Sequence, residues 1–134
     1  MPSNYPLART AEEFYPVMKA RLNSLDVETA LGVFDPACIM IDAAGAIHRG
    51  LEAIGGELEK YFSLGLQMDM AKRHLFTTGD TALLICDWSY DGIALDGTTV
   101  NMKGTASDVI RRGDDGIWRH IIDNPFGTQH RSVA

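Results

Sequence analysis

The hydrophobic period of this chain changes at Gly65 and does not change back. Before that residue, apolar side chains recur every three or four positions, which is typical of helices with one buried face. After it, apolar and polar residues alternate, as in strands that bury one face. Turn residues separate four such strands, at about 67–77, 81–91, 98–112 and 117–123. The order predicts an α+β domain in which N-terminal helices pack on one face of a curved, mostly antiparallel sheet.

The N-terminal half is predicted to form three helices and a short pair of strands. Capping residues mark where helices begin: the capping-box sequence TAEE at 10–13, and Asp26 before the second helix. Asp35-Pro36 is expected to end the second helix, and Gly65 lies where a C-terminal cap belongs. The expected elements are helices at about 10–25, 27–34 and 50–64, and strands at 38–41 and 47–49.

Length and charge limit the classes of protein to consider. At 134 residues the chain is long enough for one domain, with residues 1–9 as a leader and 128–134 as a tail. Its net charge of −6 disfavours nonspecific binding to nucleic acid or anionic membranes. No apolar run is long enough to span a membrane and no signal-peptide pattern occurs, so we expect a cytoplasmic protein. Cys38 and Cys86 are interpreted as buried hydrophobic residues without a disulfide.

An acidic residue interrupts the apolar face of the strand predicted at 98–112. By alternation, Asp108 shares that face with Val100, Met102, Gly104, Ala106 and Ile110. An ionised carboxylate among apolar side chains is costly, so such a group raises its pKa or finds a partner. Three interpretations remain open: an acid in a ligand pocket, an ion pair with Arg73 or Arg119, or a bulge at Gly104 that shifts the register.

Three stretches carry a family resemblance: LGVFDPACIMID at 31–42, HRGLEAI at 48–54 and GTASDVIRRGDDGIWRHIIDNPFG at 104–127. From about residue 10 to residue 127, the chain resembles the nuclear transport factor 2-like superfamily, which includes ketosteroid isomerases and SnoaL-type polyketide cyclases. The resemblance implies a cone-shaped α+β fold with a pocket for a small apolar or aromatic ligand. It does not select an activity, because one fold hosts many chemistries.

Two acidic positions match the ketosteroid isomerases in particular. The resemblance implies that Asp42, before a Gly-containing turn, is the catalytic base and that Asp108 is the acid that stabilises the enolate oxygen. The tyrosine of those enzymes corresponds to Met18, which cannot donate a hydrogen bond, and Tyr15 is a substitute one helical turn earlier. The residues expected to line the pocket are Tyr15, Met18, Phe62, Trp88, Tyr90 and Met102.

These residues favour a cofactor-independent isomerase, cyclase or lyase that uses acid–base chemistry on an apolar carbonyl compound. One alternative is a dehydratase that uses histidine with aspartate, for which His48, His74 and His120 are minor candidates. The other alternative is a non-catalytic ligand-binding or dimerising accessory domain. His120 shares a strand face with Trp118 and Ile122 by alternation, so it is interpreted first as a partly buried histidine with its hydrogen bonds satisfied.

The sequence offers no motif for a cofactor and one argument for a partner. No two histidines have metal-ligand spacing on one helix, and no nucleotide or flavin motif occurs, so neither a metal nor another cofactor is expected. The strands at 81–91 and 117–123 carry apolar residues on both faces. Because only one face can pack on the helices, we expect a homodimer through the outer face of the sheet.

Overall fold

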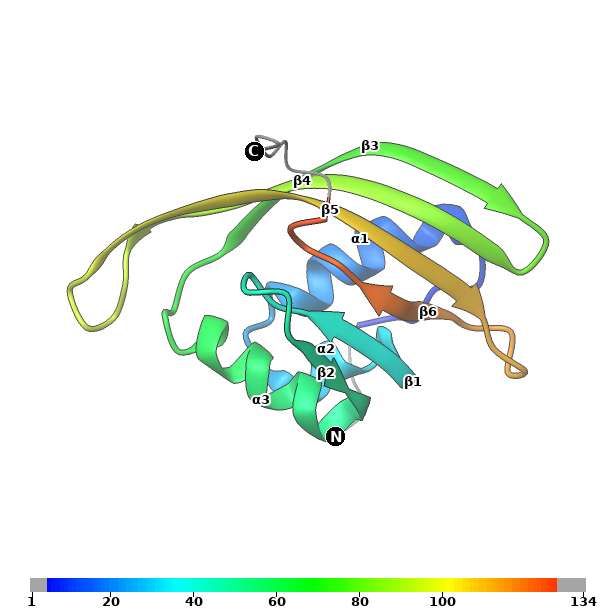
Figure 1. Ribbon diagram of the computed structural model, residues 1–134, viewed down its shortest axis with the longest axis horizontal. Helices are drawn as coiled ribbons and strands as arrows, with labels where there is room; N and C mark the ends of the chain where they lie inside the picture. The colour runs from blue at the N-terminus through cyan, green and yellow to red at the C-terminus, as the bar shows by residue number, and fades with distance from the viewer. Residues whose placement is uncertain (1–4, 128–134) are drawn as a thin grey trace.

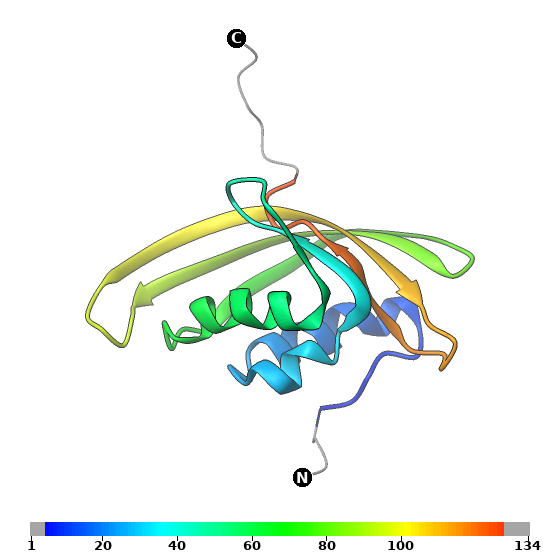
Figure 2. The ribbon, with the colours of Figure 1, turned by 60° about the horizontal axis from the view of Figure 1, so that its bottom comes forward.

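The computed structural model describes residues 5–127 and confirms the predicted α+β architecture. In chain order the elements are α1 (Ala11–Leu22), α2 (Val27–Leu31), β1 (Phe34–Ile41), β2 (Ile47–Arg49), α3 (Gly50–Phe62), β3 (Met68–Thr78), β4 (Thr81–Ile93), β5 (Thr99–Arg112) and β6 (Trp118–Asp123). The strands form one open sheet in the order β2-β1-β6-β5-β4-β3, in which β1 and β6 are the parallel pair. The helices lie beneath the concave face of this curved sheet (Figures 1 and 2).

Capping residues fix the starts of the first two helices, as the sequence predicts. The Thr10 hydroxyl accepts a hydrogen bond from the Glu13 backbone N–H at 3.2 Å, and the Asp26 carboxylate accepts one from the Thr29 N–H at 2.9 Å. The prediction for the end of α2 is wrong, because the helix stops at Leu31.

Instead of ending a helix, Asp35-Pro36 lies inside β1. A shift in the β1–β6 register between Phe34 and Ile39 leaves the intervening residues out of the ladder. Proline has no N–H to donate to a neighbouring strand, so it is tolerated at such an irregularity.

A β-bulge in β6 decides which of its side chains face the helices. His120 lies opposite Ile110 of β5, whereas Ile122 lies opposite Val109, which leaves Ile121 as an extra residue between two rungs of the ladder. A bulge of this kind shifts the alternation of side chains by one position. His120 and Ile122 therefore lie on opposite faces of the sheet, although they are two residues apart.

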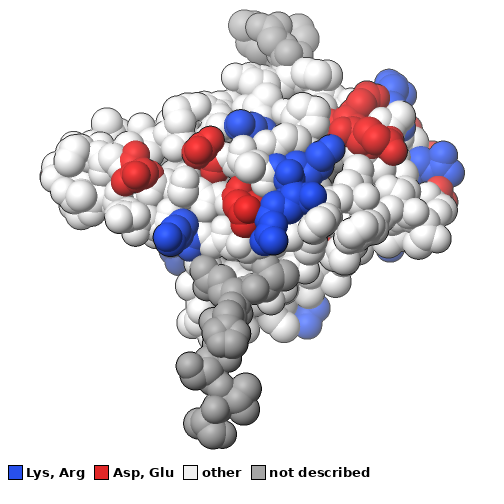
Figure 3. All heavy atoms as spheres, turned by 90° about the horizontal axis from the view of Figure 1, so that it is seen from above, with Lys and Arg blue, Asp and Glu red and all other residues white. Residues whose placement is uncertain are grey.

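The outer face of the sheet is only partly covered within one chain. On β4, Leu84 and Trp88 are buried beneath the sheet, whereas Leu83 on the outer face is 38% exposed. Phe76, opposite Leu83 on β3, is 60% exposed and stacks on the ring of His74. Figure 3, the molecule seen from above the view of Figure 1, shows charges of both signs interspersed among broad uncharged areas. The homodimer through this face stays a prediction.

Cys38 and Cys86 are buried and not disulfide-bonded, as predicted. Burial raises the pKa of the Cys86 thiol to about 12, so the thiol stays protonated at neutral pH. Within residues 5–127, none of the helices has both the length and the apolar character that a membrane crossing requires. The predicted tail at 128–134 lies outside the described residues.

Candidate active site

A cavity of about 80 Å³ lies between the helices and the inner face of the sheet. Four of the predicted pocket residues line it: Met18 of α1, Phe62 of α3, and Trp88 and Tyr90 of β4. Other apolar side chains, among them Met40 of β1, complete the wall. Three polar residues that line it are Asp108, His120 and Asp123.

Two predicted pocket residues, Tyr15 and Met102, do not line this cavity. The Tyr15 hydroxyl donates a hydrogen bond to the backbone carbonyl of Met70 at 2.9 Å, so it is already engaged at the β3 edge. Met102 is half-buried and packs against the hydrophobic core. The suggestion that Tyr15 replaces a catalytic tyrosine is therefore not supported by its position.

Gly104 is needed so that Trp88 can form one side of the cavity. The two residues are direct partners in a β4–β5 ladder that runs without a register shift, so there is no bulge at Gly104. A Cβ at Gly104 would lie 2.7 Å from Cζ2 of Trp88, which is too close. The indole N–H of Trp88 donates to the carbonyl of Pro125 at 2.8 Å and fixes the ring in place.

Asp108 is 2% exposed and lies at the polar end of the cavity. Its Oδ1 accepts a hydrogen bond from the backbone N–H of Asn124 at 2.8 Å. Burial raises the pKa of Asp108 well above its ordinary value, and the negative charge of Asp123 raises it further. The protonated, neutral form of the Asp108 carboxyl group is therefore favoured.

The ion-pair interpretation of Asp108 is wrong, because both arginines pair with other acids. Arg73 lies 3.7 Å from the carboxylate of Asp87, and Arg119 lies 2.9 Å from that of Asp115. The pocket interpretation is the one that the geometry supports.

Asp123 lines the cavity although it is not among the site residues predicted from the sequence. Continuing the β5–β6 ladder by one rung beyond the Val109–Ile122 pair places Asp123 opposite Asp108. A hydrogen bond between the two carboxyl groups is a further cause of the raised pKa of Asp108, which donates as the neutral acid. Simple alternation puts Asp123 on the face opposite to His120, and nothing in the sequence marks the bulge that reverses this.

His120 differs from its prediction, because it is fully buried and one ring nitrogen is unsatisfied. It is 1% exposed and lies between Phe14, which meets it edge-on at 4.9 Å, and Phe34, which stacks on it at 5.0 Å. Its Nε2 is 3.2 Å from Sδ of Met18. Its Nδ1 has no hydrogen-bond partner among residues 5–127. Burial lowers the pKa of His120, so the ring is neutral at neutral pH.

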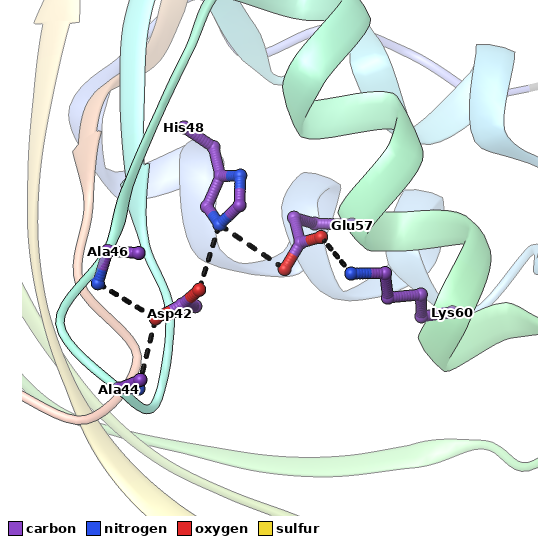
Figure 4. Close-up of polar contacts among 6 residues, drawn as sticks. All are labelled: Asp42, Ala44, Ala46, His48, Glu57 and Lys60. Carbon is purple, nitrogen blue, oxygen red and sulfur yellow. Dashed lines mark hydrogen bonds and ion pairs between the residues drawn. The ribbon is translucent and has the colours of Figure 1, made fainter.

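Asp42, the predicted base, is not among the residues that line the cavity. It lies in the turn after β1, where its Oδ1 accepts hydrogen bonds from the N–H groups of Ala44 at 3.0 Å and Ala46 at 2.9 Å (Figure 4). Its Oδ2 is 2.9 Å from Nε2 of His48. The hydrogen bond with His48 is the main cause that lowers the pKa of Asp42, followed by the Ala46 N–H.

Glu57 of α3 completes this cluster, close to the cavity wall. Its Oε1 is 3.4 Å from Nε2 of His48, and its Oε2 is 2.6 Å from Nζ of Lys60 (Figure 4). The neighbouring Tyr61 lines the cavity, and its pKa is raised first by burial and then by the charge of Glu57. We call Asp42, His48 and Glu57 the rim cluster, and Asp108, His120 and Asp123 the inner cluster.

Both clusters bring together atoms of the kinds that ligate metals. In each, one nitrogen and two carboxylate oxygens lie within 4.8 Å of one another. In the rim cluster, backbone N–H groups bind the Asp42 carboxylate and Lys60 pairs with Glu57, whereas in the inner cluster burial favours the protonated form of Asp108. His74, the remaining histidine candidate, is exposed on the outer face of β3, away from both clusters.

The family model described as a SnoaL-like domain matches residues 12–120, which run from α1 to the buried histidine of β6. The chain belongs to the SnoaL-like domain family. This membership places it in the nuclear transport factor 2-like superfamily, as the sequence predicts. No curated protein matches the sequence.

Solved structures with the same fold as this SnoaL-like domain differ widely in sequence. A ketosteroid isomerase-like protein from Erwinia carotovora atroseptica has a TM-score of 0.70 at 14% identity, with 90% of this chain and 95% of that chain covered. A protein of the nuclear transport factor 2-like family from Streptomyces avermitilis, named as a candidate dehydratase, has a TM-score of 0.68 at 18% identity, with 92% and 100% covered. A cystatin fold protein from Novosphingobium aromaticivorans has a TM-score of 0.63 at 18% identity, with 85% and 95% covered. The family includes isomerases, cyclases and dehydratases, so membership alone leaves the activity open.

Proposed function

We propose that this SnoaL-like domain is a cofactor-independent enzyme that transfers a proton on an apolar carbonyl compound, in an isomerase, cyclase or lyase reaction. The observation that carries the proposal is the pair of carboxyl groups, Asp108 and Asp123, at the polar end of an otherwise apolar cavity. Titratable groups with strongly shifted pKa values inside a cavity are typical of catalytic sites.

In this proposal the two acids have different roles because their surroundings differ. When substrate binds, the O–H group of neutral Asp108 changes its acceptor from Asp123 to the carbonyl oxygen of the substrate and stabilises the negative charge that develops there. The carboxylate of Asp123 removes a proton from the carbon next to the carbonyl and returns it to another carbon or to the leaving group. Met18, Phe62 and Trp88 exclude water from the apolar part of the substrate.

We assign the base to Asp123 and not to Asp42. The Asp42 carboxylate is bound by His48 and two backbone N–H groups, and these contacts lower its pKa. A base with a lowered pKa takes up a proton less readily. Asp42 also does not line the cavity, in which the substrate would be held.

The size of the cavity indicates a compact substrate. Its volume of about 80 Å³ is small beside the roughly 300–1,000 Å³ of sites for drug-sized ligands. A compact molecule is a better match than an extended one.

The proposal is tested without knowing the natural substrate, by exchange of the α-protons of 1-indanone in D₂O, followed by NMR. We expect the wild-type protein to accelerate the exchange over buffer, and Asp123→Asn to reduce this acceleration at least about 100-fold. Asp42→Asn is the matched control, with the same substitution at the rim, and is expected to keep the rate within about 3-fold. A larger loss of exchange rate in Asp42→Asn than in Asp123→Asn would assign the catalytic base to Asp42. Binding of 1-indanone without any exchange would support a non-catalytic ligand-binding domain.

A second candidate function, a dehydratase, is favoured by the position of His120 in the same cavity as the two acids. Such an enzyme would remove the α-proton through Asp123, while the neutral acid Asp108 gives its proton to the hydroxyl group, which leaves as water and is held by a hydrogen bond to His120. Loss of water from a β-hydroxyketone such as 4-hydroxy-2-butanone, followed by the absorbance of the enone product, separates this reaction from simple isomerisation.

A further inference from the structure

The buried histidine of the inner cluster, His120, has a ring nitrogen without a hydrogen-bond partner among residues 5–127. Among the described residues, Nδ1 of His120 is a fully buried side-chain atom that lacks a hydrogen-bond partner. Buried polar atoms in native proteins are nearly always hydrogen-bonded, and an unsatisfied one lowers stability. Because His120 also lines the cavity, a bound ligand is the natural source of the missing partner.

The surroundings of the ring determine which kind of partner fits. Phe14 and Phe34 hold the ring from two sides, and the backbone N–H of His120 is bound to the carbonyl of Val33 at 2.7 Å, so the side chain has little freedom to turn. The contact of Nε2 with Sδ of Met18 at 3.2 Å suits an Nε2–H group that donates to sulfur. In the neutral ring Nδ1 is then a lone-pair acceptor, and it requires a donor.

From this geometry we infer that the ligand is a hydroxycarbonyl compound, whose hydroxyl group donates a hydrogen bond to Nδ1 of His120 while its carbonyl accepts one from Asp108. This inference rests on the proposed function, because it takes the cavity as the ligand site. One ring nitrogen of His120 and a carboxyl oxygen of Asp108 lie within 4.8 Å of each other. Oxygens on adjacent or next-adjacent carbons of a ligand span such a gap, so a single hydroxycarbonyl unit satisfies both residues.

The inference is tested by isothermal titration calorimetry with three ketones that differ at one group. 2-Hydroxy-1-phenylethanone carries the hydroxyl group, 2-methoxy-1-phenylethanone keeps the oxygen but lacks the donor, and acetophenone lacks both. We expect the wild-type protein to bind the hydroxyketone about 5- to 10-fold more tightly than the methoxyketone. His120→Leu should bind the two with equal affinity, whereas His74→Leu, the same change at an exposed histidine, should keep the preference.

Thermal unfolding without ligand gives a second measurement. If Nδ1 is unsatisfied in the free protein, His120→Leu removes the buried polar atom and its Tm rises by a few degrees relative to wild type. A fall in Tm of the folded variant would mean that Nδ1 already has a partner such as a water molecule, and would count against the inference.

Failure of this inference and failure of the proposed function give different results. Equal affinity of the wild-type protein for the hydroxyketone and the methoxyketone would overturn the inference alone, provided that both bind and that Asp108→Leu abolishes their binding. Binding of none of the three ketones would overturn the carbonyl ligand and both proposals with it.

If His120→Leu does not fold, His120→Gln serves as the test variant. The glutamine amide reaches the position of Nε2 instead of Nδ1, so this variant is expected to lose the preference for the hydroxyl group.

Discussion

The inner cluster and the rim cluster contain nearly the same side chains, yet their acids have opposite properties. In the inner cluster, burial beside a second carboxyl group raises the pKa of Asp108. In the rim cluster, hydrogen bonds from His48 and from backbone N–H groups lower the pKa of Asp42. The imidazoles differ in the same way: His120 is buried with a free nitrogen, whereas His48 contacts two carboxylates.

This contrast shows that access to water and the number of hydrogen-bond donors determine which protonation state of a carboxyl group is favoured. Asp42 has three donors and partial contact with solvent, so its ionised form is stabilised and it holds the β1–β2 turn together. Asp108 has one donor and no solvent, so its protonated form is favoured and it can donate a hydrogen bond itself. Three predictions test whether the two clusters differ as described.

The largest expected effect is on catalysis by the inner cluster. Asp108→Leu removes the donor to the substrate carbonyl and should lower the rate of 1-indanone exchange at least about 100-fold. Asp108→Asn keeps an N–H donor at the same place and should lose only about 10-fold. Similar losses in both variants would mean that Asp108 acts by some means other than donating a hydrogen bond.

The next effect is on stability and its pH dependence. The pKa of Asp108 is raised in the folded state. Above pH 3.8, its ordinary pKa, the side chain therefore loses its proton in the unfolded chain but keeps it in the folded protein. The contribution of Asp108 to stability is therefore complete below that pH and is lost as pH rises towards the folded-state pKa. Asp108→Asn does not titrate, so its free energy of unfolding should exceed that of wild type by about 1–3 kcal/mol at pH 7, and the gap should close near pH 4.

The comparison is checked by urea unfolding of both proteins between pH 4 and pH 8. A gap that does not vary with pH would show that Asp108 ionises equally in the folded and unfolded states, and the inner cluster would then resemble the rim.

The smallest effect is expected at the rim and has the opposite sign. The pKa of Asp42 is lowered on folding, so its stabilising contribution is present above pH 3.8 and is lost as pH falls through the folded-state value. Asp42→Asn should lower Tm at pH 7, by less than Asp108→Asn raises it, and the decrease should be smaller at pH 2. Thermal unfolding followed by circular dichroism at these two pH values measures both changes, and a rise in Tm at pH 7 would contradict the role assigned to the rim.

Sequence patterns determine the fold well, because burial and capping are local signals. Alternation along 98–112 correctly places Asp108 among buried residues of β5, and the caps at Thr10 and Asp26 begin the helices where expected. The end of α2 is mispredicted, since a proline that usually stops a helix here lies at an irregular point in a strand.

The site is less predictable, because it depends on pairings between distant segments. Comparison with a family identifies Asp42 by its position after a strand, but whether its carboxylate turns to a cavity or to His48 depends on how β2 and α3 pack. Asp123 is missed because the bulge at Ile121 determines which face it lies on. The bulge arises from the pairing of β6 with β5, which the sequence of β6 alone does not show. The sequence still identifies four wall residues, since large apolar side chains with the right period face the core from the helices and from the sheet.

The extra residue in β6, Ile121, lies between His120 and Asp123 and brings these two side chains to the same face of the sheet. Deleting Ile121 would restore regular alternation and keep both on the inner face, because His120 and Asp123 would then be two positions apart. Two chains of this fold can therefore differ in length by one residue in β6 and still present the same pair of acids.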